Sequence, residues 1–263
     1  MEEVLKALIL GTVQGLTEFL PVSSTGHLLL GRKLLGLSEA GLFLDTMLHL
    51  GTLLAVVAIF WDDILYMIKR PFSKLSLLII AGTIPTAIIG LRFEDFFEEI
   101  SKTGVTVGWE FLITGAILWA ADNMKSKGSN KKNIDQISFK DALVVGTLQG
   151  AAILPAISRS GLTIAGALFR GIDRQAAARF SFLLSLPAIL GAVVLQGAKL
   201  AGGQAESIGL VPLLVGTIAA ALSGYVAVKW MLAILQRGSL KAFSIYVWIL
   251  GIGILIAQFS GKF

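Results

Sequence analysis

One short polar stretch, Glu18-Phe-Leu-Pro-Val-Ser-Ser-Thr-Gly-His27, carries an acid, three hydroxyls and an imidazole inside a strongly apolar chain. Ser24 is a candidate nucleophile, because a serine hydroxyl becomes reactive when a base takes its proton. His27 lies three residues on, on the same face of a predicted helix, so we expect it to reach Ser24. Glu18 lies across the turn, where it could orient His27 or help to hold a cation. The stretch therefore predicts acid–base or nucleophilic chemistry, with Ser24 or His27 as the attacking group.

A second stretch, in the other half of the chain, repeats the first. Gly11-Thr-Val-Gln-Gly15 matches Gly146-Thr-Leu-Gln-Gly150, and Ser23-Ser-Thr-Gly26 matches Ser158-Arg-Ser-Gly161 at the same offset after one compensated gap. Gly36 and Gly171 keep that offset. The copies differ where chemistry would require it: Glu18, Ser24 and His27 correspond to Ile153, Arg159 and Leu162. One copy thus supplies reactive groups, and the other supplies a guanidinium suited to bidentate phosphate binding.

Each of the two turns is predicted to start a helix, with Ser23 and Ser158 as the N-caps. The first N–H groups of a helix lack internal partners and carry partial positive charge, so such an end binds phosphate. Two such ends side by side would cradle a diphosphate, with Gly26 and Gly161 allowing close approach. The remaining candidates for substrate contact are Gln14, Thr25, Ser160 and Thr163.

Purely structural roles stay open for these residues. Ser23 could serve only as a cap, His27 could be a satisfied buried histidine, and Glu18 with Arg159 could form a structural ion pair. The hydroxyls of Thr17, Ser160 and Thr163 could simply bond backbone carbonyls. Three further polar residues near or within apolar segments are interpreted as boundary or packing groups: Glu110, Asp45 and His49.

The composition identifies an integral membrane protein. The 263 residues are 55% hydrophobic and 15% charged, with a mean hydropathy of +0.81. A crossing needs about 20 apolar residues. Six segments come close to that length: 46–61, 75–91, 103–121, 180–198, 207–228 and 242–261. The segments 7–31 and 142–169 are instead broken at a proline into two short helices, which is typical of re-entrant hairpins.

These elements predict an all-α membrane fold, a single domain over 1–263, with six transmembrane helices and two re-entrant hairpins. The internal repeats span about 1–121 and 139–263, joined by a polar cytoplasmic linker at 122–138. Each repeat holds three crossings, so the second copy must be inverted, which places the site near the membrane midplane. The MEEVLKALIL start does not resemble a removable signal peptide.

Charge predicts the orientation. Nearly twice as many loop Lys and Arg fall on the side away from the termini, which places that side in the cytoplasm. Both termini and the mouth of the first hairpin then face outward. The net charge of +5 is accounted for by these loops and does not indicate nucleic-acid binding. Cysteine is absent from the sequence, so neither disulfides nor thiolate metal ligands occur.

Over essentially its whole length the chain resembles the undecaprenyl-diphosphate phosphatase family, also called bacitracin resistance proteins. The resemblance is carried by Gln14-Gly-Leu-Thr-Glu18 through His27 and by Pro155-Ala-Ile-Ser-Arg-Ser-Gly161. Two positions depart from the commonest family pattern, with Gln14 in place of a first Glu and Ala156 in place of Gly.

The resemblance implies hydrolysis of the terminal phosphate of a C55 lipid diphosphate, which recycles the carrier for cell-wall synthesis. It implies roles for Ser24 as nucleophile, for His27 and Glu18 as acid–base groups, and for Arg159 in phosphate binding. It also implies a divalent cation, Mg or Ca, near Glu18, and a homodimer surrounded by membrane lipids. The alternative hypothesis is a secondary transporter or lipid flippase, because inverted repeats with broken helices are common in that class.

Overall fold

The computed structural model describes residues 1–37, 42–124, 131–201 and 208–261. Within these ranges the chain is helical, and the only β pairing is an isolated bridge between Lys132 and Ile172. The predicted all-α class is confirmed. The helices are α1 (Glu2–Phe19), α2 (Ser24–Leu34), α3 (Leu42–Ile59), α4 (Trp61–Lys69), α5 (Lys74–Arg92), α6 (Glu94–Thr103), α7 (Val107–Asn123), η1 (Ile134–Gln136), α8 (Phe139–Ala151), α9 (Arg159–Phe169), α10 (Arg174–Ala201), α11 (Leu210–Arg237) and α12 (Lys241–Phe259).

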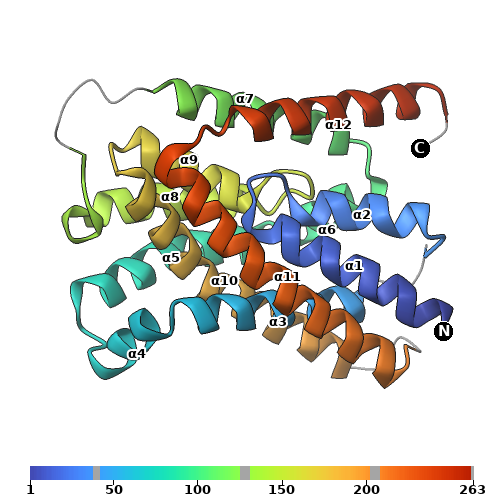
Figure 1. Ribbon diagram of the computed structural model, residues 1–263, viewed down its shortest axis with the longest axis horizontal. Helices are drawn as coiled ribbons and strands as arrows, with labels where there is room; N and C mark the ends of the chain where they lie inside the picture. The colour runs from blue at the N-terminus through green and yellow to red at the C-terminus, as the bar shows by residue number, and fades with distance from the viewer. Residues whose placement is uncertain (38–41, 125–130, 202–207, 262–263) are drawn as a thin grey trace.

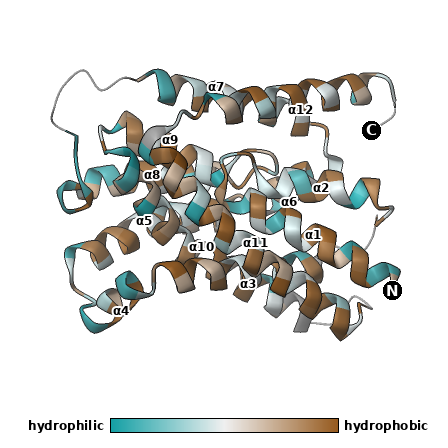
Figure 2. Ribbon diagram, in the orientation of Figure 1, coloured by the Kyte–Doolittle hydropathy of each residue, from teal (hydrophilic) through white to brown (hydrophobic). Residues whose placement is uncertain are grey.

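Several of these helices are long and apolar enough to cross a membrane. Four qualify alone, namely α5, α10, α11 and α12, and α3 with α4 forms a fifth candidate that bends by 81°. The segment predicted at 103–121 forms α7, which has 17 residues and includes Glu110. Figure 2 shows hydrophobic residues along most of α3 and α12, with more hydrophilic ones around α4. The protein is therefore a multi-pass membrane protein, while the count of six crossings stays a prediction.

Both predicted helix breaks are present. α1 ends at Phe19 and α2 starts at Ser24, while α8 ends at Ala151 and α9 starts at Arg159. Ser23 and Ser158 cap α2 and α9 as predicted, each accepting a backbone N–H from the glycine three residues later. After these two helices, Gly36 and Gly171 adopt φ of 66° and 76°, a conformation that favours glycine.

α1 is longer than the short helix predicted over 7–17. It begins at Glu2 because two acids occupy its first turn and Lys6 pairs with Glu2 one turn earlier. The acidic segment that follows α5, which lies between two of the predicted crossings, forms the short helix α6. Neither difference moves the two turns.

The two halves of the chain pack crosswise. α1 of the first half lies against α11 of the second, and α8 of the second half lies against α5 of the first. Both contacts are close because glycines meet: a Cβ on Gly11 would lie 2.2 Å from the carbonyl oxygen of Gly216, and one on Gly146 would lie 1.9 Å from that of Gly82. α7 and α12 run side by side along one edge, and the N- and C-terminal ends lie at the same end of the molecule (Figure 1).

Candidate active site

The two turns are joined by reciprocal hydrogen bonds deep inside the protein. The Ser23 hydroxyl donates to the carbonyl oxygen of Pro155 at 3.0 Å, and the Ser160 hydroxyl donates to that of Leu20 at 3.0 Å. Leu20 and Pro155 are themselves related by the offset of the repeat, so each turn offers its equivalent carbonyl to a hydroxyl of the other. Ser23 and Ser160 are both buried. The two turns therefore meet, as the repeat predicted.

Glu18 is the centre of the polar cluster between the turns. Its Oε2 accepts hydrogen bonds from the Ser24 hydroxyl at 2.5 Å and from Gln14 Nε2 at 3.0 Å, while its Oε1 forms an ion pair with Arg159. The Glu18 side chain is 6% exposed and that of Arg159 is 15% exposed. One carboxylate thus links the predicted nucleophile of the first half to the predicted phosphate-binding arginine of the second.

Arg159 keeps donor capacity for a ligand. Only its Nη2 contacts Glu18, and Nη1 is buried without a hydrogen-bond partner among the described residues. A buried guanidinium nitrogen without an acceptor is unfavourable, because its lost hydration is not replaced. A phosphate oxygen would supply that acceptor, so the ion pair with Glu18 and anion binding are compatible roles.

His27 lies elsewhere than the sequence predicted. Its Nδ1 is 2.6 Å from the Ser23 carbonyl oxygen and its Nε2 is 2.7 Å from the Tyr246 hydroxyl of α12, so both ring nitrogens are engaged. The prediction that His27 takes the proton of Ser24 is therefore not supported by the geometry. The i to i+3 spacing allows the contact, but the ring instead turns back to the carbonyl one helical turn earlier. Glu18 is the carboxylate that contacts Ser24.

His49 is a site residue that sequence reasoning missed. It comes from α3, and its Nε2 lies 3.8 Å from Glu18 Oε2, while its Nδ1 bonds the Asp45 carbonyl at 2.7 Å. The sequence alone suggested a packing group. The available signal was its rarity, because the chain has only two histidines and an ionisable residue inside an apolar span is costly unless it is used.

The second turn is held by α7. The Glu110 carboxylate accepts the Ala156 N–H at 2.6 Å, and the Thr114 hydroxyl accepts the Ser158 N–H at 3.2 Å and donates to the Ala156 carbonyl at 3.3 Å. These bonds satisfy backbone groups that a buried turn would otherwise leave unpaired. Glu110, predicted as a boundary or packing group, thus fixes the turn that precedes Arg159.

The remaining predicted contacts divide into two groups. Thr25 is exposed, whereas Ser158, Ser160 and Thr163 are buried and bonded within the protein. The Thr163 hydroxyl lies 2.8 Å from the Arg159 carbonyl and 2.6 Å from the Ser181 hydroxyl, so it faces away from the cluster.

The two glycines of the turns are packed closely as well. A Cβ at Gly26 would lie 2.6 Å from the Phe111 ring, and one at Gly161 would lie 3.0 Å from Ser158. The lack of a side chain lets Gly26 pack against Phe111 of α7 and leaves room at Gly161 for the capping Ser158, so these positions are filled by the protein and not open to an anion.

Comparison with known proteins identifies the family. The family model described as bacitracin resistance protein BacA matches residues 7–253. The chain belongs to the BacA family. Undecaprenyl-diphosphatase 3 of Bacillus cereus is 60% identical over 259 residues, covering 98% of this chain and 99% of the relative. Undecaprenyl-diphosphatases of Carboxydothermus hydrogenoformans and Halothermothrix orenii are 58% and 45% identical, covering 98% and 97% of this chain and 98% of each relative.

Resemblance to the BacA family implied a divalent cation, and the donor set limits how one could be held. Among the described residues, no three His, Cys, Asp or Glu side chains gather into a metal site. Glu18 is the only carboxylate shown at the cluster, but the Gln14 amide that donates to it keeps Oε1 buried and without a partner among the described residues. Mg²⁺ is usually held by one or two carboxylates together with substrate phosphates and water. These residues fit a cation carried mainly by a diphosphate, not a cage built by the protein alone.

Proposed function

We propose that the protein is a membrane phosphatase that hydrolyses undecaprenyl diphosphate to undecaprenyl phosphate and inorganic phosphate. This reaction recycles the lipid carrier for cell-wall synthesis and is the activity named for its relatives. The observation that carries the proposal at the level of residues is the shared contact of Ser24 and Arg159 with Glu18. It places a hydroxyl, its base and a phosphate-binding cation in one buried cluster.

In the proposed mechanism, Ser24 Oγ attacks the terminal phosphorus while its proton passes to Glu18 Oε2. The bond between that phosphorus and the bridging oxygen breaks, undecaprenyl phosphate leaves with the bond's electron pair, and Ser24 is phosphorylated. Glu18 gives its proton to the departing undecaprenyl phosphate and becomes a carboxylate again. Water then attacks the phosphoserine and passes a proton to Glu18. The bond between phosphorus and Ser24 Oγ breaks, Glu18 returns the proton to Oγ, and inorganic phosphate is released. This order follows the general logic of a nucleophile activated by an adjacent base.

Arg159 supports the reaction by electrostatics. We expect its Nη1, which is buried without a partner among the described residues, and the first N–H groups of α2 and α9 to neutralise charge on the transferring phosphoryl group, which is the main task in such reactions. Among the predicted substrate contacts, Gln14, Ser23, Ser158 and Ser160 shape this cradle through their buried hydrogen bonds, and Gly26 and Gly161 allow the close packing of its two turns. Thr25 is exposed, and Thr163 faces away from the cradle. A divalent cation, if bound through Glu18 and Gln14, would supply further neutralisation of the phosphate oxygens.

The membrane architecture is the second part of the proposal. We propose two inverted repeats, about 1–121 and 139–263, each with one re-entrant hairpin and three crossings, six in all. The crosswise packing of α1 on α11 and of α8 on α5 supports it. The starts of α2 and α9, at Ser24 and Arg159, support it as well, because they are separated by the offset of the sequence repeat. The segment 122–138 is the linker, and residues 125–130 within it lie outside the described part of the chain.

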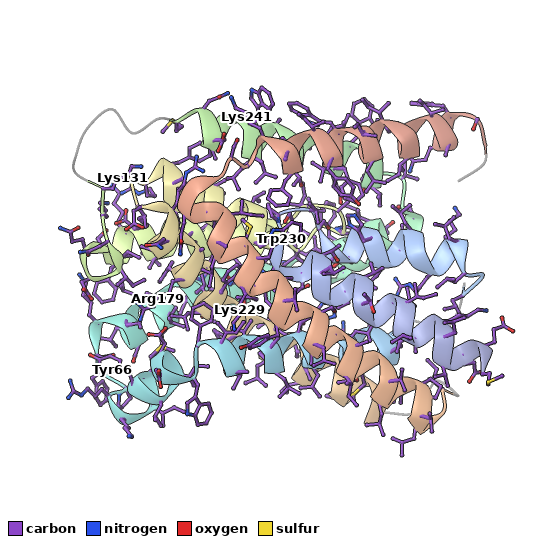
Figure 3. All side chains as sticks on the ribbon, in the orientation of Figure 1. Tyr66, Lys131, Arg179, Lys229, Trp230 and Lys241 are labelled. Atoms are coloured by element: carbon purple, nitrogen blue, oxygen red, sulfur yellow. The ribbon has the colours of Figure 1, made fainter. Side chains whose placement is uncertain are left out.

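For orientation, we propose that the termini and the site's mouth face the extracytoplasmic side. Both termini lie at one end in Figure 1, whereas Lys131 lies at the opposite end in Figure 3, in keeping with basic residues toward the cytoplasm. A homodimer is proposed on the family resemblance alone.

Phosphate release tests the proposal directly. Purified protein in detergent with C55 diphosphate should release inorganic phosphate, and Ser24→Ala should abolish release while keeping lipid binding. A transporter or flippase would release none. Turnover retained by Ser24→Ala would move the nucleophile role to water or to another residue, whereas absence of release by the unaltered protein would refute the activity itself.

A further inference from the structure

Tyr246 is an α12 residue that the proposed reaction does not use, yet it contacts the hairpin that carries Ser24. α12 packs mainly against α7, where the Trp248 indole donates to the Leu112 carbonyl at 3.0 Å. The Tyr246 hydroxyl nevertheless reaches across to His27 Nε2 at 2.7 Å, and the two rings stack at 5.7 Å with an angle of 13°. A side chain from the far end of the sequence is thus bonded three residues from the predicted nucleophile.

The hydrogen-bond roles in this contact follow from chemistry. The Ser23 carbonyl oxygen can only accept, so the hydrogen in its 2.6 Å contact with His27 belongs to Nδ1. In neutral His27, Nε2 is then the acceptor, and the Tyr246 hydroxyl donates to it. Tyr246 therefore favours the tautomer that bonds Ser23 and fixes the plane of the ring.

The far end of this chain of bonds is a strained residue. Ser23 has a φ of 68°, and it is the only non-glycine residue with positive φ among the described residues. Such a conformation is unfavourable for a residue with a Cβ and persists only where its surroundings hold it. Ser23 immediately precedes Ser24, so the direction of the Ser24 side chain depends on this backbone conformation.

The second repeat lacks an equivalent of the hydrogen bond between Tyr246 and His27. Phe111 of α7 and Tyr246 of α12 occupy equivalent positions of the two repeats, and both contact His27, Phe111 edge-on at 5.6 Å. The equivalent of His27 is Leu162, which packs in an apolar cluster with Ala152 and Ile157. The hydroxyl and the imidazole occur only beside the turn that carries the nucleophile, which indicates a role in the reaction beyond holding the helices together.

We infer that Tyr246 is a positioning residue, which acts through His27 to hold the Ser23 backbone and thereby aim Ser24 at the phosphorus. The inference rests on the proposed phosphatase activity. In it, His27 does not exchange protons with substrate. It serves as a link whose Nδ1–H holds the Ser23 carbonyl.

A phosphate-release assay on four variants tests the inference. Tyr246→Phe keeps the stacked ring and removes only the hydroxyl, so kcat should fall by about tenfold, the upper range for one lost hydrogen bond, with KM unchanged. Tyr225→Phe on α11 is the matched control and should leave kcat unaltered. His27→Asn keeps a donor close to the position of Nδ1 and should retain much more activity than His27→Leu, the residue of the second half.

A double-variant cycle distinguishes the mechanisms. In the His27→Asn background, Tyr246→Phe should have no further effect, because its partner is already absent. Multiplicative losses would show that Tyr246 acts independently of His27, and His27→Asn as inactive as His27→Leu would make His27 an acid–base group. Either result overturns the inference, as does a wild-type kcat for Tyr246→Phe. Absence of phosphate release from the unaltered protein would instead refute the proposed function.

Discussion

Glu18 offers the sharpest test of the site because it serves two partners at once. Its Oε2 accepts the Ser24 hydroxyl at 2.5 Å and its Oε1 is paired with Arg159. Glu18→Gln keeps the shape of the side chain and an acceptor oxygen but removes the charge and the basicity. The change should therefore affect turnover and stability by separate routes.

The expected losses follow from these contacts. Loss of a general base typically costs 10²- to 10⁴-fold in rate, which corresponds to roughly 3–5 kcal/mol of barrier. Removing one member of a buried ion pair costs about 3–5 kcal/mol of stability, because the remaining charge stays buried. The Glu18 and Arg159 side chains are only 6% and 15% exposed, so the full range applies to this pair.

The assay measures phosphate release and thermal unfolding on the same preparations. The double variant Glu18→Gln with Arg159→Gln removes both charges, so it should recover much of the lost stability without recovering turnover. Asp63→Asn is the matched control, because Asp63 also pairs with an arginine, Arg179, but away from the two turns. It should lower the unfolding temperature while leaving kcat of the folded protein near wild type.

The outcome that refutes the reasoning is a Glu18→Gln variant with more than about a tenth of wild-type kcat, since general-base loss should exceed that. Loss of turnover proportional to loss of folded protein would equally assign Glu18 a structural role. Both results would leave Ser24 without its base.

Three further predictions concern the surroundings of the cluster. Gln14→Glu places two carboxylates within hydrogen-bond reach on one helix face, so phosphate release should become more sensitive to chelator; an unchanged chelator titration would contradict this. Gly146→Ala should lower the stability measured in a thermal melt by about 1–3 kcal/mol or more, because the new Cβ meets the Gly82 backbone. The control Gly191→Ala has open space around it and should be neutral or stabilising by up to about 1 kcal/mol. Thr114→Val leaves the Ser158 N–H and the Ala156 carbonyl without their partner, so it should lower the stability by about 1–3 kcal/mol. It should also weaken substrate binding, with a larger effect on KM than on kcat. An unchanged KM would show that this turn does not contribute to phosphate binding.

Much of the framework could be predicted from the sequence because its causes are local. Pro21 and Pro155 lie at the breaks, Ser23 and Ser158 cap the helices that follow, and Gly36 follows α2 in the left-handed conformation. Each effect depends on a few neighbouring residues. The internal repeat added a non-local inference, that the two turns meet, because equivalent segments related by symmetry bring their equivalent faces together.

The partners within the site could not be predicted in this way. Helix spacing permits a contact between His27 and Ser24, but the ring can turn to any hydrogen-bond partner within reach, and it bonds the Ser23 carbonyl and the Tyr246 hydroxyl instead. His49 and Glu110 resemble packing groups in the sequence, because nothing along the chain shows which helix face lies against which turn.

The sequence by itself thus determined the class of protein, the two broken helices and the types of reactive side chain at the two turns. The class follows from the overall composition, and the breaks follow from proline and helix capping, which act over one or two helical turns. Only the tertiary structure decided that Glu18, not His27, contacts Ser24, and that α3, α7 and α12 each contribute a side chain. The physical reason is that a hydrogen bond is selected by distances of tenths of an ångström. Those distances are set by how distant helices pack.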